Sequence, residues 1–230
     1  MPSTCMHGRI FFMQKRWNVL ESCPPEFAAK CGEIHSVVPH LLWHRGVRDP
    51  EEVERFFNPD YESGVHDPFL FTQMRRAVDR VFEAIRNEEK ILVFGDYDAD
   101  GLTGSAMIVS QLRDLVQRLS SNAIIETYIP HRDEEGYGLQ MPQVERFAGQ
   151  NIGLLITVDC GIACPKEVEQ LGKQGTDVII VDHHQYGEDL PDAYLVHPSV
   201  PNETYPFKHL AAVGVAWKFV SALIQAAREQ

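Results

Sequence analysis

Acidic side chains crowd one short stretch of the chain, VFGDYDADGLTG (residues 93–104), in which Asp96, Asp98 and Asp100 occupy alternate positions. Carboxylates held this close together repel one another unless a cation or a proton compensates their charge. The stretch follows an apolar run, which places it at the end of a predicted strand. A bound cation is therefore the first chemistry that the stretch suggests.

Two more strand ends carry side chains of the same kind. Asp159 closes the run IGLLITVDC, and Asp182, His183 and His184 close the run DVIIVDHH. Taken alone, an Asp after a strand is usually a turn former or a helix cap, and a His pair is usually a solvated surface feature. Three strand ends that all terminate in this way favour another interpretation, in which the side chains converge on bound metal.

The side-chain types indicate which metal this would be. Carboxylate oxygens with one or two imidazole nitrogens suit Mn²⁺ or Mg²⁺ better than zinc, which favours sulfur and nitrogen. A carboxylate that bridges two ions about 3.5 to 4 Å apart creates a two-metal site for cleaving phosphoesters. In such a site the ions activate a water molecule and stabilise charge on the attacked phosphate and the departing oxygen.

Two other interpretations of the acidic stretch are disfavoured. DYDADG matches the first half of a calcium EF-hand loop, but Met107 occupies position 12, where a bidentate Glu is needed, and the stretch follows a strand rather than a helix. DADGLT could instead be the nucleophile loop of a haloacid-dehalogenase-like phosphatase, in which an Asp forms an aspartyl-phosphate. That mechanism leaves Asp159 and the Asp-His-His run without a role.

Five apolar runs are predicted to be the strands that position these residues: KILVFGD, AIIETYIP, IGLLITVDC, DVIIVDHH and AYLVHP. Helices are expected between and after them, at about 103–119, 140–149, 165–174 and 211–228. Alternating strands and helices predict a doubly wound, mostly parallel five-stranded α/β sheet with flanking helices. In such a sheet a ligand lies beyond the carboxyl ends of the strands.

The part of the chain before the sheet shows a different pattern. Residues 1–36 look irregular, and residues 37–89 are expected to form a helical lead-in. An Asp cap, a Pro and two Glu open the helix that starts with DPEEVERFF. MRRAVDRVFEAIRNEEK places one apolar face on a second helix, formed by Ala77, Val78, Val81, Phe82 and Ile85.

Composition sets further bounds. A chain of 230 residues with 44% hydrophobic content predicts one or two soluble globular domains. No apolar run approaches the roughly 18 residues that span a bilayer, and no secretory signal is apparent, which favours a cytoplasmic location without membrane contact. Five cysteines are an odd number that favours a reducing compartment, and the spacing of Cys160 and Cys164 favours small thiols over a zinc site.

The net charge of −12 argues against a large basic face for nucleic acid. It does not exclude a nucleic-acid substrate, because divalent cations held by an acidic site can restore attraction to phosphate locally.

With these residues assembled, the chain resembles the DHH phosphoesterase superfamily, and within it the RecJ-like single-strand-specific exonucleases. The resemblance covers about residues 37–221. It rests on five motifs in family order: VFGDYDADGLTGSAM, IPHRDEEGYGL, LLITVDCGI, VIIVDHHQ and HPSVPNETYPFKHLAAVGVAWKF. It implies that residues 90–230 form a DHH catalytic domain that degrades single-stranded DNA in the 5′ to 3′ direction with Mn²⁺ or Mg²⁺, in DNA repair and recombination.

The resemblance also implies a role for each matching residue. The metal ligands would be Asp96, Asp98, Asp159 and His183, with Asp98 and Asp159 shared between two ions. His184 would contact the scissile phosphate and Asp182 would orient the neighbouring imidazoles, whereas Asp100 with Gly101 would shape the turn and cap the helix that follows.

The segment IPHRDEEGYGL is expected to contact the substrate. His131 and Arg132 would meet phosphate, Tyr137 would offer its ring or hydroxyl, and Gly136 and Gly138 would let the backbone approach the strand closely. The alternative is a Gly-rich turn that leads into the helix at 140. Implied partners are single-stranded DNA and, as candidates, a single-strand-binding protein and a helicase.

The sequence departs from the family pattern at both ends. The family has a further metal-binding Asp beyond the helix that contains AAVGVAWKF, and no later acid of this sequence fits that position, so the catalytic domain is expected to be incomplete and to turn over weakly or not at all. QKRWNVLESC resembles the start of RecJ proteins, which makes Met13 a candidate initiator and residues 1–12 an extension.

Two alternatives to the exonuclease remain at this point. One is another DHH phosphodiesterase or pyrophosphatase that acts on short oligonucleotides, cyclic dinucleotides or pyrophosphate. The other is an inactive fragment that only binds nucleic acid or a partner.

Overall fold

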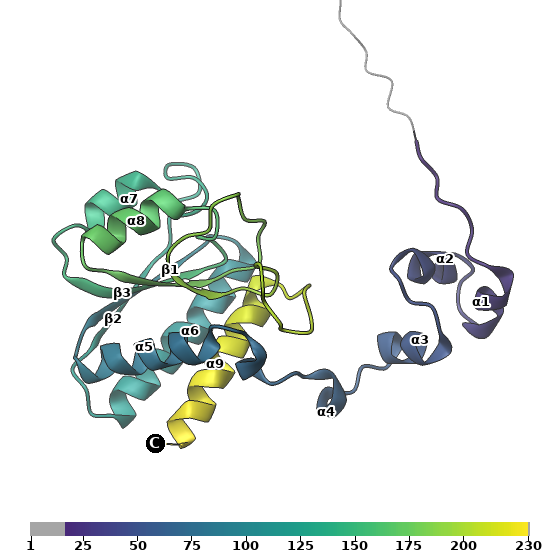
Figure 1. Ribbon diagram of the computed structural model, residues 1–230, viewed down its shortest axis with the longest axis horizontal. Coiled ribbons are helices and arrows are strands. Elements are labelled where there is room, and N and C mark those ends of the chain that lie inside the picture. The colour runs from purple at the N-terminus through teal and green to yellow at the C-terminus, as the bar shows by residue number, and fades with distance from the viewer. Residues whose placement is uncertain (1–16, 230) are drawn as a thin grey trace, which may run out of the picture. The chain divides into compact units, whose positions relative to one another are not determined.

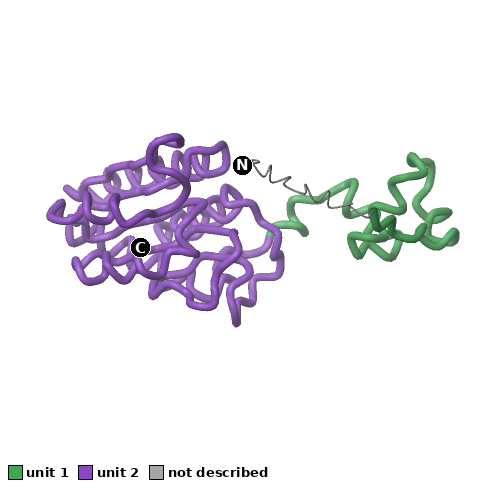
Figure 2. Tube along the Cα trace, turned by 90° about the horizontal axis from the view of Figure 1, so that it is seen from above, with its two compact units in different colours: residues 1–65 green, residues 66–230 purple. Residues whose placement is uncertain are grey.

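A computed structural model describes residues 17–229 of the chain (Figure 1). The chain divides into two compact units, Met1–Val65 and His66–Gln230 (Figure 2). The division falls inside the segment 37–89, which the sequence pattern predicted to be a helical lead-in. Residues 1–12, the predicted extension, lie outside the described part.

Residues 17–65, the described part of the first unit, contain four short helices: α1 (Pro25–Lys30), α2 (Val37–His44), α3 (Pro50–Phe57) and α4 (Tyr61–Gly64). The prediction that residues 1–36 are irregular overlooked α1. As predicted, Asp49 caps α3, because its side chain accepts a hydrogen bond from the backbone N–H of Glu52. A small core holds the unit together, formed by Cys23, Phe27, Cys31, Leu42 and Val53.

The second unit contains a five-stranded sheet in which every pairing is parallel and the strand order is β2-β1-β3-β4-β5. This confirms the predicted α/β sheet. The strands are β1 (Lys90–Gly95), β2 (Ile124–Tyr128), β3 (Ile152–Val158), β4 (Asp177–Val181) and β5 (Tyr194–Val196). Each lies within one of the predicted apolar runs, and the acidic residues that close three of those runs stand just beyond the strands.

Helices cover both faces of the sheet, as the doubly wound prediction requires (Figure 1). On one face lie α5 (Met74–Arg86), α6 (Ala99–Arg118) and α9 (Ala212–Arg228), and on the other lie α7 (Met141–Phe147) and α8 (Pro165–Lys173). A 3₁₀ turn, Pro68–Leu70, precedes α5. The apolar face predicted for α5 is fully buried, at Ala77, Val78, Val81, Phe82 and Ile85.

The strand order creates a natural binding crevice. From β1 the chain runs to β2 on one side, and it later returns to place β3 on the other side of β1. The loops that leave the carboxyl ends of β1 and β3 therefore diverge, which is where open α/β sheets bind their ligands.

Backbone hydrogen bonds hold the three strand-end aspartates at the same level of this edge. The N–H of Asp96 donates to Val158 O at 3.1 Å, and the N–H of Asp159 donates to Val181 O at 2.9 Å. The N–H of Asp182 continues the series by donating to the carbonyl oxygen of the residue that ends β5, at 3.3 Å. Each of these bonds continues the hydrogen-bond pattern between two parallel strands by one residue beyond the strand. The three aspartates therefore lie at the same edge of the sheet because β1, β3 and β4 are neighbours in it.

At the opposite end of the strands, a buried arginine fastens α5 to the sheet. Arg80 is 7% exposed, and its guanidinium donates to Asp177 Oδ2 and Glu89 Oε2, each at 2.6 Å, and to Gly153 O at 3.1 Å. Because the two carboxylates keep part of their hydration, Arg80→Met is expected to lower the free energy of unfolding by about 2–3 kcal/mol, below the cost of breaking a fully buried pair. Urea titration measures this loss. Arg86→Met, at an exposed position of the same helix, is the control, and equal midpoints for the two variants would contradict the prediction.

Candidate metal centre

Asp98 caps α6 at the edge of the sheet. Its Oδ1 accepts hydrogen bonds from the backbone N–H groups of Asp100 at 2.9 Å and Gly101 at 3.0 Å. The bond from Gly101 is the main cause that lowers the pKa of Asp98 below its usual value. At Gly101 an added Cβ would lie 2.7 Å from the Cβ of Asp96, so glycine lets α6 begin this close to the end of β1.

Asp100 has a different role from the predicted one. It was expected to help cap the helix that follows it, but Asp98 performs that function. The carboxylate of Asp100 instead accepts the backbone N–H groups of Ala212 at 2.9 Å and Val213 at 2.6 Å. Asp100 thus caps α9, a helix more than a hundred positions away, and satisfies donors that the first turn of α9 leaves unpaired.

Asp159 lies at the centre of the acidic edge. Its backbone has φ +63°, an uncommon left-handed conformation that Asp tolerates better than most residues and that often marks functional sites. Asp159 is only 2% exposed. Burial, followed by the nearby charge of Asp100, raises the pKa of Asp159 to about 7. The positive charge of His184 lowers the pKa of Asp159, but it does not offset the effects of burial and of the neighbouring carboxylates.

Asp182 fixes the positions of the two histidines that follow it by accepting hydrogen bonds from them. It is fully buried, and its Oδ1 accepts the N–H of His183 at 2.7 Å, the N–H of His184 at 3.2 Å and Nδ1 of His184 at 2.8 Å. Its Oδ2 accepts the N–H of Ile162 at 3.2 Å. Burial alone would raise the pKa of Asp182, but these hydrogen bonds, led by the ring of His184, lower it below the usual value.

The two imidazoles reach Asp159 from the neighbouring strand. His183 Nε2 lies 3.5 Å and His184 Nδ1 lies 3.6 Å from Asp159 Oδ1. Because Asp182 only accepts, the proton of neutral His184 resides on Nδ1, which leaves Nε2 without a proton. The hydrogen bond with Asp182 raises the pKa of His184 above its usual value, so His184 is readily protonated.

Sequence reasoning missed a buried histidine below this pair. His197 is fully buried at the end of β5, and its Nε2 lies 2.8 Å from the carbonyl oxygen of His184. Its Nδ1 accepts the N–H of Ser199 at 3.1 Å, which makes Nε2 the donor to His184. Burial lowers the pKa of His197, so the ring stays neutral and holds the backbone of His184 in place.

These side chains form two sets that could each hold an ion. Asp96, Asp98 and Asp159 offer ligand atoms within 4.8 Å of one another, and so do Asp159, His183 and His184. Asp159 belongs to both sets. Oδ1 of Asp96 and Oδ1 of Asp159 are buried without a hydrogen-bond partner, which is the condition that a bound cation would relieve. The three carboxylates of the first set fit Mn²⁺ or Mg²⁺, whereas the second set offers one carboxylate and two imidazoles.

The predicted substrate segment is only partly brought to this centre. Tyr137 Oη donates to Asp159 O at 3.0 Å and lies 3.0 Å from His184 Nδ1. The guanidinium of Arg132 lies 5.0 Å from the centre of the Tyr97 ring. In the sequence, Tyr97 stands between Asp96 and Asp98. The ring of His131 makes no described contact with either ligand set.

The turn in this segment has its own structural support. Gly136 and Gly138 have φ values of +75° and +76°, so both use a backbone conformation that favours glycine. An added Cβ at Gly136 would meet no protein atom within 4 Å, so the positive φ is what favours glycine at this position. Glu135 closes the turn by accepting the N–H of His131 at 2.7 Å and pairing with Arg146 at 3.2 Å.

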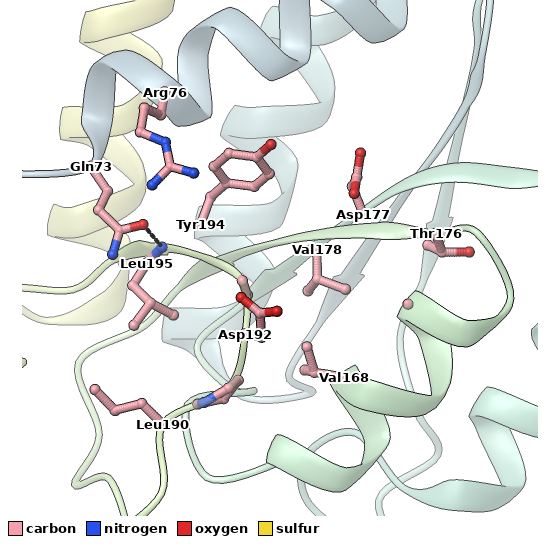
Figure 3. Close-up of a pocket in the computed structure, with 13 residues that line it drawn as sticks. Gln73, Arg76, Val168, Thr176, Asp177, Val178, Leu190, Asp192, Tyr194 and Leu195 are labelled. Atoms are coloured by element: carbon pink, nitrogen blue, oxygen red, sulfur yellow. Dashed lines mark hydrogen bonds between the residues drawn. The ribbon is translucent and has the colours of Figure 1, made fainter.

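A separate cavity of about 490 Å³ lies at the amino ends of β4 and β5 (Figure 3). Its lining includes Asp177 and Arg76, and the side chain of Gln73 accepts the backbone N–H of Leu195 there. None of the residues of the two ligand sets lines this cavity, so it is distinct from the metal centre.

The fold and the ligand sets define an α/β protein with paired acidic and imidazole sites at the switch point of a parallel sheet. The chain belongs to the DHH family: the model of the DHH family, N-terminal domain, matches residues 90–230. Within that family its relatives are RecJ exonucleases.

Two curated relatives illustrate this similarity. The chain is 39% identical over 212 residues to the single-stranded-DNA-specific exonuclease RecJ of Bacillus subtilis, which covers 91% of this chain and 26% of that protein. It is 37% identical over 194 residues to RecJ of Thermus thermophilus, with coverage of 80% and 26%. The chain therefore spans about a quarter of the length of these relatives.

Solved structures agree. A crystal structure of exonuclease RecJ bound to manganese matches with a TM-score of 0.60 at 36% identity, over 68% of this chain and 38% of that one. RecJ from Thermus thermophilus in complex with Mn²⁺ matches with a TM-score of 0.64 at 30% identity, over 93% of this chain and 29% of that one.

Among residues 17–229, no helix is both long enough and apolar enough to cross a membrane.

Proposed function

We propose that the chain carries the metal-dependent phosphodiesterase centre of a 5′ to 3′ exonuclease that acts on single-stranded DNA in repair and recombination. The observation that carries the proposal is the shared position of Asp159 in two ligand sets, together with its orphaned buried oxygen. The relatives named above are single-stranded-DNA-specific exonucleases, and solved RecJ structures hold Mn²⁺ or Mg²⁺.

Asp96, Asp98 and Asp159 would hold one ion, and Asp159 and His183 would hold the second. Bound there, two divalent ions would activate water and offset the charge of the attacked phosphate. Asp182 would keep the ring of His184 oriented, and its charge favours a protonated ring that can donate to a phosphate oxygen. Tyr137 would fix the distance between His184 and the backbone of Asp159.

Outer parts of the substrate segment have weaker roles in this proposal. Arg132 would contact phosphate beside the metal centre, supported by the ring of Tyr97. His131 would contact the strand further out, and Gly136 and Gly138 would shape the turn that presents Tyr137.

The test uses protein in excess over a single-stranded oligonucleotide labelled at its 3′ end, so that even a slow first cleavage is seen. With Mn²⁺ we expect the labelled strand to shorten stepwise from its 5′ end, and a matched duplex to resist. Asp98→Asn should abolish the shortening, whereas Arg86→Met should retain it. Absence of both Mn²⁺ binding and Mn²⁺-dependent shortening would contradict the proposal, and preferential cleavage of dinucleotides or pyrophosphate would favour another DHH activity.

The proposal extends to the setting of the enzyme. A cytoplasmic location is supported by free cysteines at Cys23, Cys31, Cys160 and Cys164, which suit a reducing compartment. Candidate partners are a single-strand-binding protein and a helicase, as the family resemblance implies.

A further inference from the structure

A second groove opens beside the metal centre. We call it the Lys208 groove, and it has a volume of about 460 Å³. It is lined by His183, His184, Gln185, Tyr186, Ser199, Lys208, His209 and Leu210. Two of these residues belong to the metal centre, so the groove is continuous with the place where the scissile phosphate would lie. The remaining lining residues were not among the predicted site residues.

The groove differs in charge from the rest of this acidic chain. None of its described lining residues is acidic, although the chain has a net charge of −12. Lys208 and His209 are exposed, and the ammonium of Lys208 makes a single described hydrogen bond, to Glu203 O at 2.9 Å. That bond uses one of its three protons and leaves the cation free to meet an anion.

Local hydrogen bonds hold the basic side of the groove in place. Ser199 Oγ donates to Lys208 O at 3.2 Å, and the N–H of Ser199 donates to the buried ring of His197. The loop that carries Lys208 is thus tied to the residue that also holds the backbone of His184. The ammonium is therefore carried by a loop fixed relative to the metal centre.

An aromatic ring forms another wall of the same groove. Tyr186 is 38% exposed, and its ring packs edge-on against His197 with centroids 6.1 Å apart. Its hydroxyl donates to Ser199 O at 3.3 Å, which fixes the ring without covering it. An ordered, exposed ring next to a cation is the combination that proteins use to bind single-stranded nucleic acid, where bases stack on the ring and phosphates meet the cation.

His184 also lines a second cavity. That cavity has the same volume of about 460 Å³, and its lining includes Tyr137, Gly138 and Cys164. A polynucleotide cleaved next to His184 needs room for nucleotides on both sides of the scissile phosphate, and the two cavities provide it. A substrate no larger than pyrophosphate would need neither.

We propose that the Lys208 groove binds the nucleotide next to the scissile phosphate in a single-stranded polynucleotide, with its phosphate on Lys208 and its base on the ring of Tyr186. This inference rests on the proposed function, because it assigns part of the substrate of the same site.

The test measures the affinity of the chain for a fluorescent oligothymidylate by anisotropy, with Ca²⁺ in place of Mn²⁺ to slow cleavage. Lys208→Gln is expected to weaken binding about tenfold and to reduce the slope of log affinity against log salt by about 0.7, the value for one phosphate contact on a single strand. Lys208→Arg should restore both. Lys173→Gln, at a lysine on α8 that pairs with Glu169, is the matched control.

The ring is tested in the same assay. Tyr186→Ala is expected to weaken binding fivefold or more, as loss of a stacked base does, whereas Tyr186→Phe keeps the ring and should bind within twofold of the unmodified chain. Mn²⁺ affinity by calorimetry should be the same for all these variants. That control separates loss of the groove from damage to the metal centre.

The outcomes distinguish the two proposals. If the unmodified chain binds Mn²⁺ and shortens DNA, but Lys208→Gln binds oligothymidylate as tightly as Lys173→Gln, the groove proposal is wrong and the proposed function stands. If the unmodified chain binds Mn²⁺ but no oligonucleotide, the groove proposal is also wrong. If it neither binds Mn²⁺ nor cleaves, the proposed function fails, and the groove proposal fails with it.

Discussion

Asp159→Asn is expected to abolish Mn²⁺ binding while making the metal-free protein more stable. Asp159 belongs to both ligand sets, so its loss impairs both together. Loss of a residue that only orients a ligand already weakens metal binding by about 10- to 100-fold. Loss of this shared ligand should therefore cost at least about 100-fold in Mn²⁺ affinity, and nuclease activity should fall with it.

The gain in stability follows from the raised pKa of Asp159. The carboxyl group has a pKa of about 7 in the folded chain and a usual value of 3.8, so below pH 7 the folded state binds the proton more tightly than the unfolded state. The contribution of Asp159 to the stability of the metal-free protein therefore falls as the pH rises from about 4 to about 7, with an upper limit of about 1.4 kcal/mol per pH unit. The amide in Asp159→Asn carries no charge, so the variant avoids the unfavourable burial of an ionised carboxylate at neutral pH.

Calorimetric Mn²⁺ titration and thermal unfolding in EDTA at pH 5 and pH 8 measure the two effects. The raised pKa of His184 also favours folding at low pH, so the difference between the unmodified chain and Asp159→Asn isolates the contribution of Asp159. That difference should be larger at pH 8 than at pH 5. Asp79→Asn, at an exposed position on α5, should change neither property. Tight Mn²⁺ binding by Asp159→Asn would refute the shared-ligand assignment.

Asp182→Asn is expected to have the opposite effect on stability. Oδ1 accepts three hydrogen bonds and Oδ2 accepts one from Ile162, so both oxygens of the carboxylate face donors. An amide group would point its own N–H protons at one of these donors and leave it unpaired in a fully buried place. We expect a loss of about 2–4 kcal/mol in the free energy of unfolding.

The pH dependence of this loss identifies its cause. Because the pKa of Asp182 is lowered on folding, its stabilising contribution is present above the usual carboxyl pKa and disappears as the pH falls through the folded value. The difference in the free energy of unfolding between the unmodified chain and Asp182→Asn, measured with urea, should thus be large at pH 7 and small below about pH 4. A gap of the same size at both pH values would point to a packing defect instead.

The sequence predicted the sheet well because its signal is local. β1, β3 and β4 are short apolar runs that are largely buried, and parallel strands covered on both faces show such runs without alternation, whereas the edge strand β2 is mostly exposed. The strand-end rule then brought Asp96, Asp159 and Asp182 together, because it needs only the order of elements and the general position of ligands in open sheets.

What the sequence did not reveal depends on contacts between distant segments. The partner of Asp100 is the first turn of α9, and no local pattern predicts that a residue in one helix caps another. His197 looked like an ordinary residue at a strand end, because its role depends on burial beside His184.

The cap that Asp100 places on α9 has a mechanical consequence. At about 1.5 Å per residue, the 17 residues of α9 form a rod about 25 Å long. The N-terminal end of that rod is held by the carboxylate of Asp100, and Oδ2 of this carboxylate lies 3.9 Å from His183 Nε2. The N-terminal end of this rod is therefore fixed at the same edge of the sheet as the metal centre, so the two Asp100 hydrogen bonds position α9 and the acidic edge relative to each other.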